Sequence, residues 1–290
     1  MKPAAFTYHR PASLEEALAL LAEFGADAKL VAGGQSLAPM MNMRLASPAH
    51  LIDVNDLSEL GRVRLRDDSI EIGALARHHQ IAESPQVQRH CALLAQTART
   101  IGHYAIRQRG TVGGSLAHAD PAAQHALAAV TLGARLTLAR KGGQRVVEAR
   151  DFLLSAMGTA LVADEMIVSV SYPTLGPAEV SAFRMFNLRH GDYALVAVAA
   201  TLELTGGRVQ RLRLGIAGAA PMPQRFDALA RQFEGQLPTP QWIGQVAQAA
   251  RDAVEPEEHP RVPAVYRKEL TGTLVARTLA RCVQKHESQT

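Results

Sequence analysis

The sequence predicts a folded protein of mixed helices and strands, divided into two or three domains, and three observations support this prediction. The chain has 290 residues, of which 47% are hydrophobic, so it can bury more than one core. Short apolar runs typical of strands alternate along it with segments of helical periodicity. A break rich in proline and glycine, between Pro173 and Pro177, precedes a final third in which two strands are followed by helices.

The N-terminal segment contains the clearest predicted helix. Residues 13–25 combine an apolar stripe of period 3.6 with Ser13 as N-cap, Glu16 three residues later, and Gly25 in the C-cap position. KLVAGG is typical of a buried strand that runs into a glycine pair, and AHLIDVN of a second strand. The first unit is therefore expected to be strand, loop, short helix and strand.

A second unit is expected to begin after Gly61. Alternating residues over 61–73 predict a hairpin that turns at Asp67 and Asp68, and HHQIAESP continues as a helix. Residues 86–107 have a helical pattern, and TVGGSLAHADP, residues 111–121, is expected to form a second glycine loop. AAQHALAAVTLGA predicts an apolar helix leading into the strand RLTLAR.

The segment beyond the proline and glycine break predicts a third unit. DYALVAVAATLEL and RVQRLRLGIAGAA are expected to be strands, followed by the helices DALARQF and WIGQVAQAARDAV. A last helix is expected through LTGTLVARTLARCVQ.

Composition excludes several classes of function. The formal net charge is only +4, and no basic run interleaved with aromatic residues indicates a nucleic-acid surface. The N-terminal residues have no apolar core of signal-peptide length, and no window approaches the roughly 18 apolar residues of a membrane span. We therefore expect a cytoplasmic protein that binds no nucleic acid and has no membrane span.

The cysteines and histidines indicate no metal site in this chain. Two cysteines, Cys91 and Cys282, are too few for a four-cysteine iron–sulfur site, and Cys91 lies in an apolar helical pattern that predicts a buried, inert thiol. The 11 histidines are scattered apart from His78 and His79, and no HExxH spacing occurs.

Two glycine pairs, each followed by a serine, carry the strongest chemical signal. Paired glycines can adopt positive φ and gather consecutive backbone N–H groups into a nest that binds an oxyanion. Gly33 and Gly34 precede Gln35 and Ser36, and Thr111 precedes a second pair that ends in Ser115. Either pair alone is also explained by a tight turn between a strand and a helix. Two converging nests would suit a pyrophosphate, although neither motif is GxGxxG or GxxxxGK[ST].

Three segments together resemble a known family. AGGQSLAPMMNMRLASPAHLIDVN, IRQRGTVGGSLAHADPAA and RHGDYALVAVAA are similar, in this order, to the FAD-binding medium subunit of the molybdenum hydroxylases, the family of xanthine dehydrogenase and carbon monoxide dehydrogenase. The resemblance implies an α+β fold of the vanillyl-alcohol-oxidase and MurB (PCMH) type, with FAD-binding subdomains at residues 1–56 and 57–175. It also implies a C-terminal domain at residues 176–286, built of a three-stranded sheet and helices.

The resemblance also implies which residues contact non-covalently bound FAD. On one side the pyrophosphate would meet Ala32, Gly33, Gly34, Gln35, Ser36 and Leu37, and on the other Thr111, Gly114 and Ser115. The Asp120 carboxylate would accept hydrogen bonds from ribitol hydroxyls, with an N-cap for a helix opening at Pro121 as the alternative. The segment Ile101 to Ile106, with Leu161 and Met166, would line the isoalloxazine and adenine ends or form plain core.

Tyr193 is similar to the aromatic residue that covers the isoalloxazine in this family, where it would stack on the ring. Some relatives carry a lysine in the strand before this loop, where this chain has Met185 and Asn187.

The implied function is electron transfer, with no catalytic residue in this chain. FAD would take electrons from two [2Fe–2S] clusters of a small partner subunit and pass them to an external acceptor. A large partner subunit would carry molybdopterin, and the assembly would be a dimer of heterotrimers. Two alternatives are a self-sufficient MurB-like flavin oxidoreductase and a scaffold that has lost FAD. The first lacks a paired acid and base in the sequence, and the second is opposed by the intact glycine pairs and Asp120.

Overall fold

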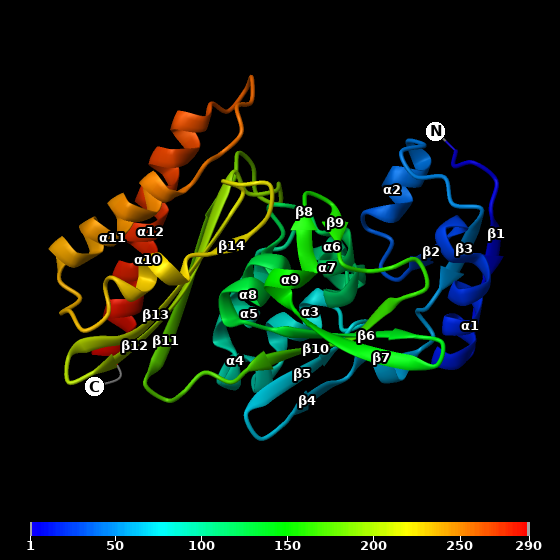
Figure 1. The fold of residues 1–290 in the computed structure, drawn as a ribbon, viewed down its shortest axis with the longest axis horizontal. Helices are drawn as coiled ribbons and strands as arrows, with labels where there is room; N and C mark the ends of the chain where they lie inside the picture. The colour runs from blue at the N-terminus through cyan, green and yellow to red at the C-terminus, as the bar shows by residue number, and fades with distance from the viewer. Residues whose placement is uncertain (1, 289–290) are drawn as a thin grey trace.

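Three main sheets follow one another along the longest axis of the computed structural model, which describes residues 2–288 (Figure 1). The N-terminal sheet lies at one end, a five-stranded sheet with most of the short helices is in the middle, and the C-terminal sheet with its long helices is at the other end. The predicted alternation of helices and strands in successive units is confirmed.

The N-terminal sheet is parallel, in the order β1-β3-β2. Its elements are β1 (Thr7–His9), α1 (Leu14–Phe24), η1 (Gly25–Asp27), β2 (Ala28–Val31), α2 (Leu37–Asn42) and β3 (His50–Asp53). The predicted first helix is confirmed, because the Ser13 hydroxyl accepts from the Glu16 N–H at 3.1 Å and Gly25 closes the helix with φ of 50°. The predicted order of strand, loop, short helix and strand is confirmed by β2, α2 and β3.

The central sheet is antiparallel, in the order β4-β5-β10-β6-β7. Its strands are β4 (Val63–Leu65), β5 (Ser69–Gly73), β6 (Arg135–Arg140), β7 (Gly143–Glu148) and β10 (Met166–Pro173). A two-stranded sheet, β8 (Leu153–Ser155) with β9 (Gly158–Thr159), lies beside it. The helical segments are η2 (Ser58–Gly61), α3 (His78–Glu83), α4 (Pro85–His90), α5 (Ala92–Arg99), α6 (Tyr104–Arg109), α7 (Val112–His118), α8 (Gln124–Leu132) and α9 (Ala149–Phe152). The predicted hairpin at Asp67 and Asp68 is confirmed.

Two expectations for the central unit were wrong. The predicted helical run over 86–107 is interrupted at Cys91, which both ends α4 and precedes α5, and again at residues 100–103. The predicted second glycine loop is helix α7 instead. A Cβ on Gly113 would lie 2.6 Å from the Ala74 Cβ, so this glycine lets a helix pack closely beyond the end of β5 instead of forming a turn.

Asp120 does not cap a helix that opens at Pro121, because α8 begins only at Gln124. Its carboxylate accepts from the Ala122 N–H at 2.8 Å, and its carbonyl accepts from the Ala123 N–H at 3.0 Å. Asp120 therefore shapes a turn between α7 and α8.

The C-terminal sheet has four antiparallel strands, not the three that were expected. They are β11 (Glu179–Phe186), β12 (Val196–Thr205), β13 (Arg208–Ala217) and the two-residue β14 (Gln224–Arg225), followed by α10 (Asp227–Arg231), α11 (Pro240–Ala253) and α12 (Ala264–Glu287). The extra strand is short and pairs with β13 only at Gly215 and Ile216.

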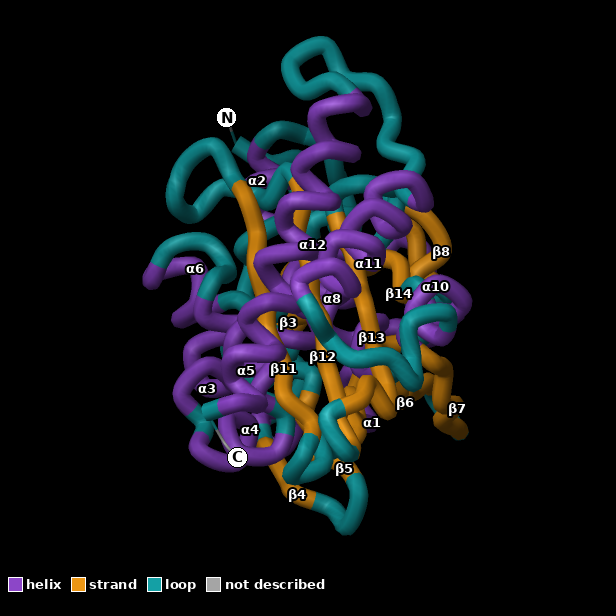
Figure 2. Tube along the Cα trace, turned by 90° about the vertical axis from the view of Figure 1, so that its left-hand side faces the viewer, coloured by secondary structure: helices purple, strands orange, loops and turns teal. Residues whose placement is uncertain are grey.

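The C-terminal sheet is buried on both faces. Helices α11 and α12 lie in front of β11, β12 and β13 in Figure 2, and Val198 and Ala200 belong to the core on that side. Ala197 and Ala199, which alternate with them along β12, belong to the core of the central unit. A Cβ on Gly215 would lie 1.9 Å from the Thr131 hydroxyl of α8, so the two units make close contact.

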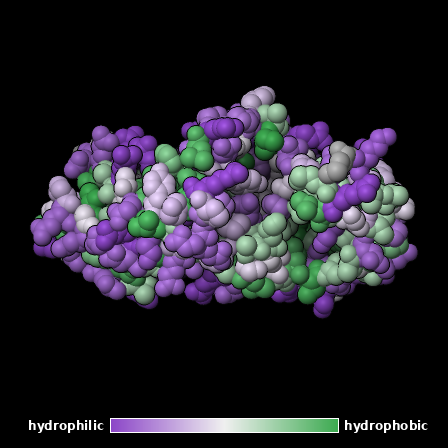
Figure 3. Space-filling view, turned by 90° about the horizontal axis from the view of Figure 1, so that it is seen from above, coloured by the Kyte–Doolittle hydropathy of each residue, from purple (hydrophilic) through white to green (hydrophobic). Residues whose placement is uncertain are grey.

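Among the residues that the structure describes, no helix is long and apolar enough to cross a membrane. Figure 3 shows mostly hydrophilic residues on the face seen from above, with smaller hydrophobic patches between them.

Two histidines form a buried pair at the centre of the molecule. Nε2 of His125 and Nδ1 of His78 are 3.0 Å apart, and the exposed fractions of the two residues are 0% and 4%. Burial lowers the pKa of His125 to about 4, and burial together with the neighbouring His125 lowers the pKa of His78 well below its usual value. Both imidazoles are therefore neutral at pH 7.

This burial predicts a loss of stability as the pH falls. An unfolded His125 binds a proton below about pH 6.5, whereas the folded residue does so only near 4, so the unfolded state gains protons first. Between pH 7.5 and 5, His125 should lower the free energy of unfolding by about 2 kcal/mol. Urea titrations of wild type and His125→Gln at both pH values measure this. If wild type and His125→Gln lost the same free energy of unfolding between pH 7.5 and 5, the burial of His125 would have no such cost.

Candidate functional site

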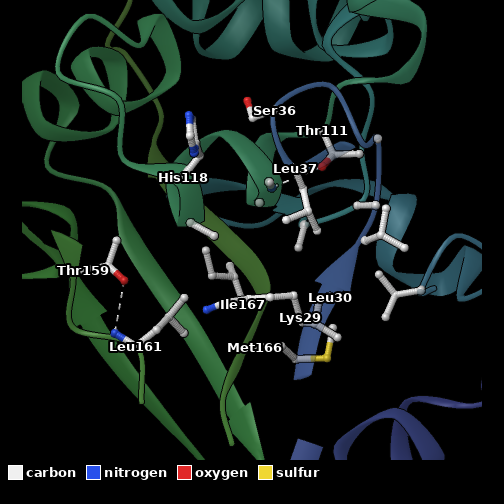
Figure 4. A pocket seen from close by; sticks show the side chains of 18 of the residues that line it. Lys29, Leu30, Ser36, Leu37, Thr111, His118, Thr159, Leu161, Met166 and Ile167 are labelled. Atoms are coloured by element: carbon white, nitrogen blue, oxygen red, sulfur yellow. Dashed lines mark hydrogen bonds between the residues drawn. The ribbon is translucent and has the colours of Figure 1, made fainter. Parts of the chain in front are cut away.

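A cavity of about 680 Å³ lies between the N-terminal and central units. Its walls come from β2, the loop before α2, the start and exposed side of α7, and the segment leading into β10 (Figure 4). Ten of the predicted site residues line it: Ala32, Gly33, Gly34, Gln35, Ser36, Leu37, Thr111, Gly114, Leu161 and Met166. The structure thus brings both glycine pairs to one cavity.

The first glycine loop offers unpaired backbone donors. The carbonyl of Ala32 accepts from Asn55 Nδ2 at 2.8 Å, and that of Gly33 accepts from Gln35 Nε2 at 2.7 Å. Carbonyls further along this loop accept from the first turns of α2. Within residues 2–288, the N–H groups of residues 33–37 have no acceptor, and Gly34 has a φ of 69°. Free N–H donors beside a left-handed glycine are the groups that an oxyanion nest requires.

The second glycine pair forms no nest, contrary to our expectation. The N–H groups of Val112 and Gly113 donate to the carbonyls of Ala76 and Ala74 at 3.0 and 2.8 Å. The Gly114 N–H donates to the Thr111 hydroxyl at 3.1 Å, which caps α7. Because these N–H groups already have acceptors within the chain, this side of the cavity forms no second anion cradle. It supplies a helix surface that carries no side chain at Gly114.

The two glycine segments touch through their backbones. A Cβ on Gly33 would lie 2.2 Å from the Arg109 carbonyl oxygen and 2.8 Å from the Gly110 Cα. No side chain fits between them, so a glycine is required at position 33 for the first loop to reach the second segment.

The remaining predicted residues do not line the cavity: Ile101, Ile106, Ser115, Asp120 and Tyr193. Tyr193 nevertheless approaches the first loop from the C-terminal unit, although 58% of its surface is exposed. Partial burial and the nearby Asp120 carboxylate raise its pKa, and the Ser36 hydroxyl lowers it. Ser36 of the first loop and Asp120 therefore both lie near Tyr193.

Met185 and Asn187 have structural partners. Gln124 Nε2 lies 3.5 Å from the Met185 sulfur, which ties β11 to α8. Asn187 Nδ2 donates to the Asp192 carbonyl at 3.2 Å, next to Tyr193. The side-chain amide of Asn187 thus stabilises the loop that carries Tyr193.

Sequence reasoning missed three charged or titratable residues of the cavity: Lys29, His118 and Glu165. His118 could have been found, because it follows Gly114 by four residues and shares its face of α7. Glu165 accepts from Arg145 Nε and Nη2 at 2.6 and 2.7 Å, and this pairing lowers its pKa. It is therefore an ionised partner of an arginine, not a free acid or base.

The chain has an α+β fold with a cavity beside a glycine loop whose N–H groups are unpaired, and comparison with known proteins identifies the class of protein. Residues 4–175 match the FAD binding domain in molybdopterin dehydrogenase, and residues 181–282 match the CO dehydrogenase flavoprotein C-terminal domain. The chain therefore belongs to the FAD-binding medium subunits of the molybdenum hydroxylases. It is the flavoprotein subunit of a multi-subunit oxidoreductase, as the resemblance predicted.

Individual relatives match nearly end to end. The chain is 36% identical to the 6-hydroxypseudooxynicotine dehydrogenase complex subunit alpha of Paenarthrobacter nicotinovorans, covering 98% of this chain and 97% of the relative. In solved structures, carbon monoxide dehydrogenase from Hydrogenophaga pseudoflava matches with a TM-score of 0.95 at 35% identity, over 98% of this chain and 99% of the other. Quinoline 2-oxidoreductase from Pseudomonas putida 86 matches with a TM-score of 0.94 at 33% identity, over 99% of each.

The contact between the glycine segments predicts the effect of Gly33→Ala. The added methyl would collide with the Arg109 carbonyl and displace the first loop at a cost of about 1–3 kcal/mol. The flavin-to-protein ratio of the purified complex should fall sharply. Gly61→Ala is a matched control, because nothing lies within 4 Å of a Cβ there. Full flavin occupancy in the Gly33 variant would mean that the contact is not needed.

Proposed function

We propose that the chain binds FAD non-covalently in this cavity and uses it to pass electrons from a partner's [2Fe–2S] clusters to an external acceptor. The observation that carries the proposal is the loop at residues 33–37, whose N–H groups are free while the carbonyls of Gly33, Gly34 and Ser36 accept hydrogen bonds from within the chain. A pyrophosphate carries the negative oxygen atoms that such a nest attracts. FAD, when bound, supplies the redox-active isoalloxazine ring.

The residues present fit such a cofactor. The N–H groups from Gly33 to Leu37 would hold the pyrophosphate, with Thr111 and Gly114 on the facing side. Leu161 and Met166 supply apolar wall. At the other end the Asp120 carboxylate would accept from ribitol hydroxyls, the Ile101 to Ile106 segment would flank the ring, and Tyr193 would cover it.

We also propose the finer fold type and the domain division. The parallel N-terminal sheet and the central sheet around one cavity support a vanillyl-alcohol-oxidase and MurB (PCMH) type of FAD fold. Separate sheets support FAD-binding subdomains at residues 1–56 and 57–175, and a C-terminal domain at 176–286.

Partners must supply the substrate chemistry in this proposal. Both cysteines are buried, and burial raises the pKa of each thiol to about 12, so neither is a ligand poised for a cluster. Glu165, the carboxylate in the cavity, is paired with Arg145. We therefore assign the two [2Fe–2S] clusters to a small subunit and molybdopterin to a large one, in a dimer of heterotrimers.

The proposal predicts how the flavin is reduced. In the assembled complex, the organic substrate should bleach the flavin absorbance, and acid precipitation should release the flavin into the supernatant. The flavin-loaded chain alone should not be bleached by the same substrate, because the proposal assigns substrate oxidation to the molybdopterin of a partner subunit. Stopped-flow absorbance separates the cases. Bleaching of the isolated chain would favour a self-sufficient MurB-like oxidoreductase, and flavin that stays in the acid pellet would contradict non-covalent binding.

The position of Tyr193 predicts an effect on one half-reaction. Tyr193→Ala removes the ring expected over the flavin, so reoxidation by the acceptor should change several-fold, whereas reduction of the molybdenum centre by substrate should stay as in wild type. Tyr193→Phe keeps the ring and should resemble wild type. Tyr266→Ala, which removes another partly exposed tyrosine from α12, is the control. Unchanged reoxidation in Tyr193→Ala would remove this residue from the site.

A further inference from the structure

The backbone of Arg77 is fixed to the segment that contains the second glycine pair. Arg77 precedes α3 and forms an isolated antiparallel bridge with Thr111. On either side of this bridge, the His78 N–H donates to the Gly110 carbonyl and the Val112 N–H to the Ala76 carbonyl, both at 3.0 Å. The Arg77 backbone therefore moves with the second glycine segment.

The Arg77 side chain contacts one residue near each glycine pair. Its Nη2 donates to Asn55 Oδ1 at 2.7 Å, and its Nη1 donates to the carbonyl of Arg109. A guanidinium presents its donors in a rigid planar fork, so one side chain can hold two acceptors in fixed relative positions. Asn55 belongs to the segment after β3. Arg109 is the last residue of α6 and is followed by Gly110 and Thr111, which lead into α7.

Asn55 continues the connection to the first glycine loop. Its Nδ2 donates to the Ala32 carbonyl at 2.8 Å and to Asp53 Oδ1 at 2.6 Å. The backbone N–H of Asn55 also donates to Asp53 Oδ1, at 2.9 Å. Since Arg77 offers only donors, the amide oxygen must face it and the amide nitrogen must face Ala32. The chain of contacts from the Ala32 carbonyl to the Arg109 carbonyl is thus complete.

These two carbonyls control the geometry of the cradle. In a trans peptide the C=O and the following N–H point in opposite directions, so holding the Ala32 carbonyl toward Asn55 turns the Gly33 N–H away from it. The Arg109 carbonyl is the atom against which Gly33 rests. One side chain therefore influences both the direction of the first free donor and the position of the wall that it approaches.

We infer that Arg77, acting through Asn55, is the positioning residue that holds the two glycine segments in register for the cofactor's pyrophosphate. The inference rests on the proposed FAD site, and it requires no contact between Arg77 and a phosphate. It differs from a purely electrostatic role, because the fork geometry and the amide partner matter as well as the charge.

The test measures FAD release from the assembled complex by flavin fluorescence after dilution, in Arg77→Met, Asn55→Ala and the double variant. Each single change should speed release on the order of tenfold, since each breaks a hydrogen bond to a charged group. The double variant should be little worse than either single one, because both break the same connection. Arg77→Lys, which keeps the charge and loses the fork, should release FAD nearly as fast as Arg77→Met.

Arg99→Met is the matched control, because Arg99 Nε also donates to a backbone carbonyl, that of Ala82 at 3.2 Å, within the central unit. It should release FAD at the wild-type rate. Wild-type release from Arg77→Met or Arg77→Lys, or additive effects in the double variant, would overturn the inference while leaving the proposed function intact. If Arg77→Met does not assemble, Asn55→Ala and Arg77→Lys decide the question by the same criteria. A wild-type complex without FAD would overturn the proposed function and this inference with it.

Discussion

The contact between Gly33 and the Arg109 carbonyl joins two units that otherwise have separate sheets. It needs a residue without a Cβ at position 33, because a side chain there would collide with the backbone of Arg109 and Gly110. The core beneath the contact is shared in the same way: Leu18 and Leu21 of α1 belong to one cluster with Met166 and Val168 of β10. The cavity has its shape because this shared core brings the first loop to the start of α7.

The two glycine pairs have similar sequences but opposite roles. The first leaves its N–H groups unpaired beside a cavity, which is a cost in a folded protein unless water or a ligand supplies the acceptors. The second has its N–H groups satisfied by Ala74, Ala76 and Thr111, so it contributes closeness of packing instead. Binding capacity is thus concentrated on one side of the cavity, and the other side supplies a smooth, rigid surface.

The sequence allowed much of this to be predicted where local signals were sufficient. Ser13, Glu16 and Gly25 mark α1 because capping depends on neighbours within one turn. The second glycine pair was misjudged because its partners, in residues 74–76, are remote in sequence and decide whether the N–H groups are free. For the same reason the sequence could not show that Tyr193, from the C-terminal unit, comes near Ser36 and Asp120. Lys29 carried no signal at all, since a lysine in an exposed position of a strand is ordinary.

Recognition by the main chain has a consequence for how such a protein changes over time. In the first loop the binding groups that we propose are peptide N–H groups, which every residue other than proline possesses, so side chains there can be exchanged without removing a donor. Only positions with a steric or torsional demand, such as Gly33 and Gly34, are closed to substitution. A site of this kind tolerates extensive drift elsewhere, which is consistent with a TM-score of 0.95 to a structure that shares 35% of its residues. Divergence is then free to concentrate on the loops and surfaces that face other molecules.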